Sequence, residues 1–223
     1  VMKIEKNPLG LIGYLAAISY YGLLWFDGEQ YVTLMAIAAL MLLMTMYVFT
    51  FPKYKTEEIT VAFFGIFYVA VMLSYLYQVR EMPDGGLLVW LIFISSWGCD
   101  TCAYCAGMLF GKHKLTPVLS PKKTIEGAVG GVAGAALLGY LYALLIGHKM
   151  MVVGNPRLAC AMACAIAAVI SQVGDLAASA IKRNHEVKDY GHLIPGHGGI
   201  LDRFDSMIFT APAIYFAVTF LAR

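Results

Sequence analysis

Residues 59–79 read ITVAFFGIFYVAVMLSYLYQV, an uncharged run of aromatic and branched side chains. A helix of about 20 apolar residues spans the hydrocarbon core of a bilayer, so this stretch predicts a transmembrane helix. The whole chain of 223 residues agrees, since 60% of it is AVILMFWYC, only 13% is DEKR and its mean hydropathy is +0.72. A soluble domain has about 25% charged residues. The sequence therefore predicts an integral membrane protein.

Six further apolar runs of comparable length flank this stretch, and none alternates as a membrane strand would. The predicted fold class is therefore all-α, a polytopic transmembrane helical bundle of about seven spans. The first span is too long for a signal-peptide core and no small-residue cleavage site follows it, so it is expected to be retained. Val1 is not a methionine, so residues are expected upstream. The last span is short, and Pro212 is expected to kink it. The predicted spans are roughly 9–26, 31–51, 59–79, 87–109, 125–147, 158–181 and 206–222.

The distribution of Lys and Arg predicts the orientation of these spans. Of 16 such residues, 12 fall on the side of the N-terminus and 4 on the other, which places the N-terminus in the cytoplasm. The net charge of +2 gives no reason to expect a nucleic-acid partner. Five cysteines, an odd number, argue against a disulfide framework. The expected organisation is an N-terminal part, 1–85, of about three spans and a C-terminal part, 86–223, with cytoplasmic loops 110–124 and 182–205.

Three ionisable residues fall inside the predicted spans: Asp100, Glu126 and Asp175. A charged aspartate at the bilayer centre costs roughly 2.5–3.5 kcal/mol on insertion scales, so such groups usually face the bundle interior and have a partner. They indicate a polar site, and they would also fit the pathway of an ion-coupled transporter or channel.

Residues 171–206, SQVGDLAASAIKRNHEVKDYGHLIPGHGGILDRFDS, contain much of the remaining charge. On a helix, Asp175, Ser179, Lys182 and Arg183 share one face. The simplest interpretation is an aspartate with polar neighbours and two cations reaching for the membrane surface. The turn 195–199 cannot be regular helix, and its glycines permit positive φ and close approach to an anion.

Two aspartates follow this turn. Asp202, Asp205 and Ser206 stand at i, i+3 and i+4, and if a helix has begun there both carboxylates point the same way. Carboxylates on one face, with Asp175 on another helix, suit a hard cation such as Mg²⁺. A phosphate-rich ligand would be attracted by the nearby cations, Lys182, Arg183, Lys188 and Arg203.

A second charged segment precedes the fifth span. Ser120-Pro121-Lys122-Lys123-Thr124 leads into a helix for which Thr124 is the expected N-cap. The lysine pair is either an ordinary cytoplasmic loop or a phosphate clamp at a helix N-terminus. The pairs Gly127/Gly131 and Gly130/Gly134 predict close helix packing, as do the cysteines.

These motifs resemble those of the phosphatidate cytidylyltransferase (CDP-diacylglycerol synthase) family. The resemblance rests on Ser179-x-Ile-Lys182-Arg183, Lys188-Asp189 and Pro195-Gly-His-Gly-Gly-x-x-Asp202-Arg203-x-Asp205, and upstream on Asp100-Thr-x-Ala-Tyr104, Phe110-Gly-Lys112, Ser120-Pro-Lys-Lys-Thr124 and Glu126-Gly127. It covers about 100–206. It implies transfer of the cytidylyl group of CTP to phosphatidic acid, giving CDP-diacylglycerol and pyrophosphate, with Mg²⁺ (two ions are conceivable) as cofactor.

The resemblance also implies roles for individual residues. The catalytic group would comprise Asp175, Asp202, Lys182, Arg183 and His197; the substrate-binding group would comprise Ser120, Lys122, Lys123, Thr124, Lys188, Gly198, Gly199 and Arg203. Asp175, Asp202 and Asp205 are assigned to metal binding, and Asp100 either joins them or orients a lysine. The expected partners are CTP, phosphatidic acid and membrane lipids, with a homodimer also open. The expected location is a bacterial-type inner or plasma membrane, with the active site facing the cytoplasm.

Three other functions are weighed against this one. A transporter or channel would spread its acidic residues along a path, whereas here they cluster with lysines and a glycine turn. A CDP-alcohol phosphotransferase would resemble a different aspartate pattern, which does not occur here. A membrane scaffold would leave the segment 171–206 unexplained.

Overall fold

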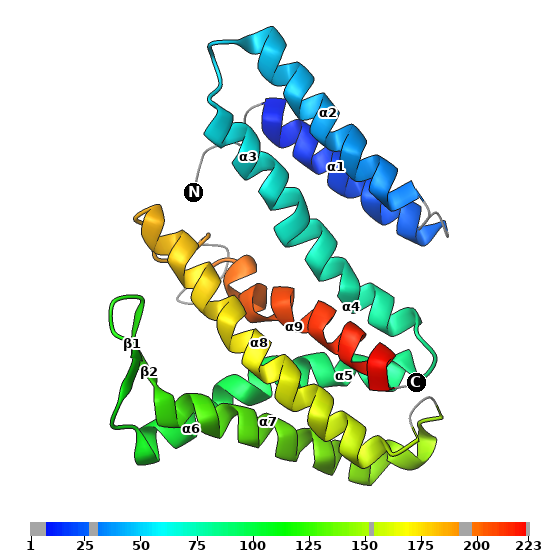
Figure 1. The fold of residues 1–223 in the computed structure, drawn as a ribbon, viewed down its shortest axis with the longest axis vertical. Coiled ribbons are helices and arrows are strands. Elements are labelled where there is room, and N and C mark those ends of the chain that lie inside the picture. Colours follow the sequence, from blue (N-terminus) through cyan, green and yellow to red (C-terminus); the bar gives the residue numbers. More distant parts are fainter. Residues whose placement is uncertain (1–7, 27–30, 152–153, 192–197, 222–223) are drawn as a thin grey trace. The chain divides into compact units, whose positions relative to one another are not determined.

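The computed structural model describes residues 8–26, 31–151, 154–191 and 198–221. Within these residues, seven helical segments are long and apolar enough to cross a membrane (Figure 1). They run over Pro8–Trp25, Val32–Thr50, Thr56–Glu81, Gly85–Phe110, Ile125–Lys149, Pro156–Asn184 and Leu201–Leu221. The all-α bundle of seven spans predicted from the sequence is confirmed.

The contacts divide the chain into two compact units, Val1–Ser74 and Tyr75–Arg223. The first contains α1 (Pro8–Trp25) and α2 (Val32–Thr50), which pack together with α3 (Thr56–Gly65) around an apolar core. The π-helix η3 (Ile66–Val71) and α4 (Met72–Glu81) continue the third span, and the division between the units falls inside α4. The sequence placed the division after this span, at 85.

The second unit contains the charged segments. Its first span is built from α5 (Gly85–Phe93), the π-helix η4 (Ile94–Gly98) and α6 (Cys99–Phe110). Then follow α7 (Ile125–Ile146), the 3₁₀ turn η5 (Gly147–Lys149), α8 (Pro156–Asn184) and α9 (Leu201–Leu221). The helix α8 packs against both α7 and α9, while α6 packs against α7. Because α8 has neighbours on two sides, polar groups on it can be shielded from lipid.

Small residues bring these helices close together. An added Cβ at Gly131 of α7 would lie 3.0 Å from the carbonyl oxygen of Cys99, and one at Gly139 would lie 2.7 Å from the sulfur of Cys164. Both cysteines are buried and free. The packing role predicted for the glycines and cysteines is therefore confirmed at these positions.

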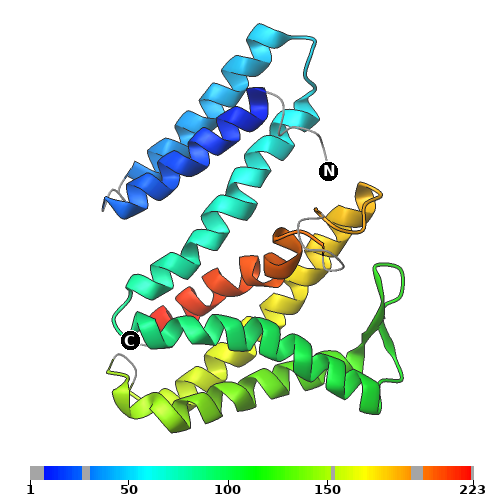
Figure 2. The ribbon, with the colours of Figure 1, turned by 180° about the vertical axis from the view of Figure 1, so that it is seen from behind.

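The segment predicted as a loop at 110–124 contains a β-hairpin. Strands β1 (Lys114–Thr116) and β2 (Ser120–Thr124) pair antiparallel, with Lys114 opposite Thr124 and Thr116 opposite Ser120. Figure 2 shows the hairpin standing where α6 ends and α7 begins. The strands are too short for a period-of-two pattern to be recognised in the sequence. Thr124 also caps α7, since its hydroxyl accepts a hydrogen bond from the N–H of Gly127 at 3.1 Å.

The last span begins earlier than predicted. Because α9 starts at Leu201 rather than near 206, Asp202, Arg203 and Asp205 lie in its first two turns. The sequence prediction that only three ionisable residues fall inside the spans is therefore wrong. The aspartates at the start of α9 are compensated by α8, because both of them contact Lys182.

Candidate active site

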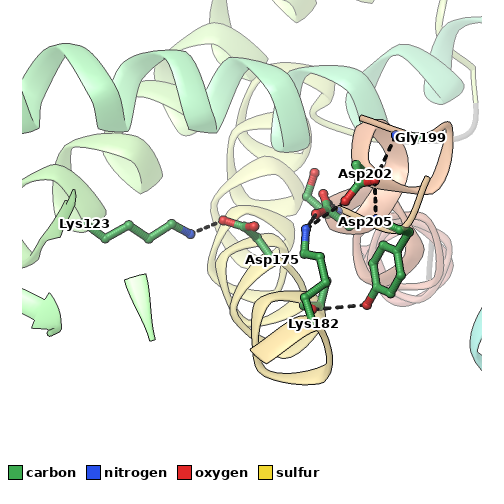
Figure 3. Close-up of polar contacts among 9 residues, drawn as sticks. Lys123, Asp175, Lys182, Gly199, Asp202 and Asp205 are labelled. Carbon is green, nitrogen blue, oxygen red and sulfur yellow. Dashed lines mark hydrogen bonds and ion pairs between the residues drawn. The ribbon is translucent and has the colours of Figure 1, made fainter. Parts of the chain in front are cut away.

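A buried lysine joins α8 to the start of α9. Lys182 Nζ lies 3.0 Å from Oδ1 of Asp202 and 3.7 Å from Oδ2 of Asp205. The three side chains are 13%, 7% and 12% exposed, respectively. Figure 3 shows both carboxylates turned toward the lysine. The prediction that Asp202 and Asp205 point the same way is confirmed. We call these three residues the α9 cluster.

Asp202 has hydrogen bonds on its second oxygen as well. Its Oδ2 accepts the N–H of Tyr190 at 2.8 Å and the N–H of Gly199 at 3.0 Å. The turn predicted to have positive φ does so at Gly198, where φ is +81°. An added Cβ at Gly198 would lie 3.2 Å from the same Asp202 oxygen. Gly199 and Tyr190 therefore each bring a backbone donor to a carboxylate of the protein itself, so Asp202 ties both of these segments to α9.

Tyr190 was not singled out in the sequence, yet it completes this cluster. Besides its N–H, its hydroxyl donates to the carbonyl oxygen of Ala178 at 3.1 Å, and its ring centroid lies 5.1 Å from Lys182 Nζ. A cation over an aromatic face is stabilised by the ring quadrupole. Helical or strand periodicity could not identify Tyr190, because Tyr190 lies in irregular backbone after the end of α8.

A second ion pair lies one to two turns earlier on α8. Lys123, at the end of β2, reaches across to Oδ2 of Asp175, and the two side chains are 28% and 27% exposed (Figure 3). Lys123 and Asp175 both line a cavity of about 380 Å³ bounded by α6, the hairpin, α7 and α8. Lys122, Thr124 and Asp100 line the same cavity. Sequence reasoning thus selected five residues that the fold brings around one cavity.

Gln172 is a further cavity residue that sequence reasoning missed. Its Nε2 donates to the carbonyl oxygen of Ala128 at 3.0 Å and approaches the sulfur of Cys99 at 3.5 Å. The amide therefore ties α8 to both α7 and α6 at the wall of the cavity. Its position could have been noticed in the sequence, because a polar amide on an apolar helix three residues before Asp175 lies on the same face as that aspartate.

The remaining candidate residues lie outside both groups. Arg183, Lys188 and Arg203 are exposed, and Ser120 is half-buried at the start of β2. None of them lines the cavity as far as the described residues define it. His197 lies outside the described residues. The exposed cations can still attract an anionic ligand to this end of the molecule.

Four carboxylates gather around these ion pairs. Asp205 interacts electrostatically with both Asp100 and Asp175, which also repel each other. Within the described part of the chain, no three His, Cys, Asp or Glu side chains converge closely enough to enclose a metal ion. Mg²⁺ is usually held by one or two carboxylates together with water and phosphate oxygens. Asp175 on α8 and Asp202 on α9 therefore offer the type of ligand atom that Mg²⁺ takes, although they do not by themselves enclose an ion.

Comparison with known proteins identifies the family to which the chain belongs. The model of the cytidylyltransferase family matches residues 2–221. The chain is 34% identical to the phosphatidate cytidylyltransferase of Bacillus subtilis (strain 168) over 221 residues, which is 96% of this chain and 80% of the relative. It is 36% identical to that of Staphylococcus saprophyticus over 193 residues, covering 85% of this chain and 70% of the relative. The enzyme of Staphylococcus aureus (strain COL) is 34% identical over 223 residues, with 95% and 82% covered. These comparisons give the transporter alternative no support. The chain belongs to the cytidylyltransferase family.

Proposed function

We propose that this protein is a phosphatidate cytidylyltransferase that joins CTP and phosphatidic acid to give CDP-diacylglycerol and pyrophosphate. The observation that carries the assignment is the placement of charge along α8. Asp175 pairs with a lysine of the hairpin, and Lys182 pairs with two aspartates of α9. Family membership and the names of the relatives supply the substrates.

The chemistry needs positioning and charge compensation more than a protein nucleophile. An oxygen of the phosphatidic acid phosphate attacks the α-phosphorus of CTP, and a new O–P bond forms. The bond from the α-phosphorus to the oxygen bridging it to the β-phosphorus breaks, and pyrophosphate departs with that electron pair. The lipid phosphate is already nucleophilic, which agrees with the lack of an evident Ser-His-Asp triad in the sequence.

The lysines are the groups that can bind the phosphates. Lys122 and Lys123 present two ammonium groups at one wall of the cavity, next to the N-terminus of α7. Such a terminus favours anions because its first N–H groups point outward. Lys182 lies on the same helix as Asp175 and would neutralise charge on the opposite side of the reacting phosphates. Arg183, Lys188, Arg203 and His197 would assist from the periphery.

Mg²⁺ dependence is part of the proposal. Four aspartates, against the charges of Lys122, Lys123 and Lys182, leave an excess of one negative charge beside the proposed nucleotide site. The lysines are therefore already balanced by carboxylates, and a bound cation would supply the further positive charge that a polyanionic nucleotide needs. Asp175 and Asp202 would hold Mg²⁺, with Asp205 and Asp100 nearby. When bound, the ion would neutralise charge on the phosphate oxygens.

The membrane setting explains why both substrates can reach one site. The cavity wall includes the charged side chains of Lys122, Lys123 and Asp175, and also the apolar side chains of Ala103, Met108 and Leu115. A charged nucleotide could enter from water and a diacyl lipid from the bilayer. The excess of Lys and Arg on the N-terminal side supports a site that faces the cytoplasm.

The direct test incubates purified protein with labelled CTP and phosphatidic acid, with and without Mg²⁺. We expect a CDP-lipid and pyrophosphate only when Mg²⁺ is present. Failure to form a CDP-lipid would overturn the proposed function. Asp175→Asn and Asp202→Asn should each lower the rate at least about 100-fold, whereas the exposed Glu81→Gln should not change it. Full activity in either Asp variant would refute the metal assignment while leaving the reaction in place.

A further inference from the structure

The β-hairpin that carries Lys122 and Lys123 cannot fix its own position. Its strands are three and five residues long, and their register is irregular between Lys114 and Thr116. An isolated two-stranded hairpin is at best marginally stable in water. Both lysines nevertheless line the cavity, and Lys123 reaches Asp175 on α8. Something outside the hairpin must therefore hold its base.

Glu126, in the first turn of α7, makes that connection. Its Oε2 accepts the N–H of Lys112 at 3.1 Å, and both of its oxygens lie 3.2 Å from the N–H of His113. Its Oε1 lies 2.6 Å from Nδ1 of His113, which donates to it. One carboxylate thus holds the backbone and the side chain that immediately precede β1. The N–H of Ile125 also donates to the carbonyl oxygen of His113 at 2.9 Å.

These contacts leave Glu126 outside the cavity. Neither it nor His113 is among the residues that line it, and the His113 side chain is 74% exposed. A carboxylate directed at a triphosphate would repel the triphosphate. The Glu126 carboxylate instead accepts hydrogen bonds from Lys112 and His113 at the base of the hairpin. Hydrogen bonds to an ionised carboxylate are about twice as strong as neutral ones. Glu126 can therefore affect a ligand only through the segment it holds.

We propose that Glu126, together with His113, is a positioning residue that holds the hairpin so that Lys122 and Lys123 face the nucleotide phosphates. This inference rests on the proposed function. A plain alternative is that Glu126 only stabilises the start of α7 through the helix dipole. That role would lower stability without changing the affinity for CTP.

A double-mutant cycle separates the two roles, because residues that act as a unit are not additive. Glu126→Ala alone should raise the KM for CTP about tenfold with a smaller change in kcat. In a Lys122→Ala/Lys123→Ala background, the same substitution should change the KM less than about twofold. An equal loss in both backgrounds would overturn the proposal. If the double-lysine variant turns over too slowly, equilibrium binding of CTP to the purified protein gives the same cycle.

Two further variants sharpen the experiment. His113→Ala removes the side-chain contact with Glu126 and should raise the KM for CTP less than Glu126→Ala does. If both variants lose the same stability and keep the wild-type KM, Glu126 acts only on the start of α7. Glu58 is the matched control, since it also lies in the first turn of a helix and accepts a backbone N–H, that of Lys55, at 2.9 Å. Glu58→Ala should leave the KM for CTP unchanged. If the wild-type protein makes CDP-lipid but the cycle is additive, the positioning role of Glu126 is overturned, while the proposed reaction is unaffected.

Discussion

Replacing Lys182 by methionine tests whether the α9 cluster holds the second unit together. Methionine keeps most of the length and apolar stem of lysine but removes the ammonium group. Asp202 and Asp205 then lose their shared cation while staying 7% and 12% exposed. Asp202 keeps two backbone donors, whereas among the described residues Asp205 retains one, the N–H of the following residue Ser206 at 2.8 Å. Two carboxylates in one small space would then repel each other.

The expected loss follows from that burial. Surface ion pairs contribute about 0–1 kcal/mol, but removing one partner of a buried pair costs about 3–5 kcal/mol because the other charge stays desolvated. At 13% exposure Lys182 belongs to the second class, so we expect Lys182→Met to lower the free energy of unfolding by about 3 kcal/mol. Lys123→Met breaks a pair that is 28% and 27% exposed, and we expect a loss of about 1 kcal/mol.

The assay is reversible unfolding in mixed detergent–SDS micelles, followed by circular dichroism. Arg183→Met is the control, since it removes the adjacent but exposed cation and should change stability by less than about 0.5 kcal/mol. Asp205→Asn introduced into Lys182→Met should recover part of the loss by removing the repulsion. Equal stability of the Lys182→Met and Arg183→Met variants would contradict the role of the α9 cluster. So would a further loss of stability when Asp205→Asn is added to Lys182→Met.

Three other results follow from the same structure. Gly130→Leu should destabilise the protein by about 1–3 kcal/mol, because its side chain would collide with Ala106; Gly13→Leu, where an added Cβ meets nothing within 4 Å, is the control in the same unfolding assay. Gln172→Leu should cost about 1 kcal/mol, since the carbonyl oxygen of Ala128 loses its amide donor inside the bundle; an unchanged unfolding curve would contradict this. Chelating divalent cations should abolish CDP-lipid formation, and adding Mg²⁺ back should restore it; activity that persists in chelator would remove the metal from the proposal.

The membrane architecture was predictable because length and hydropathy leave few choices for a spanning segment. A run such as 59–79 can hardly be anything but a helix in a bilayer, since every backbone N–H and C=O must be satisfied within it. Helix ends are a different matter. The start of α9 was predicted too late because Asp202, Arg203 and Asp205 lower the local hydropathy, although the two aspartates pair with Lys182 of α8.

The site was predictable as a set of residues but not as a set of partners. The sequence singled out Lys123, Asp175, Lys182 and Asp202, yet their pairing depends on which helices lie side by side. Asp175 and Lys182 share a face of α8 in the sequence, but each pairs with a different element, the hairpin for one and α9 for the other. Tyr190 was missed because it acts from irregular backbone, which no periodicity marks.

The pairing also explains how a bundle can hold this much charge at the end of its helices. Each lysine lies where it neutralises a carboxylate in the resting protein, so the cost of desolvating either charge alone is avoided. The same lysines are the groups that a phosphate-rich ligand needs. One ammonium group cannot fully neutralise a carboxylate and a phosphate at the same time. Under the proposed function, binding would exchange these partners: the ammonium groups would turn to phosphate, and a cation would face the aspartates in their place. The more exposed Lys123–Asp175 pair would exchange first, because water already screens it. The buried Lys182, which does not line the cavity, would exchange later because its pairs with Asp202 and Asp205 are largely shielded from water.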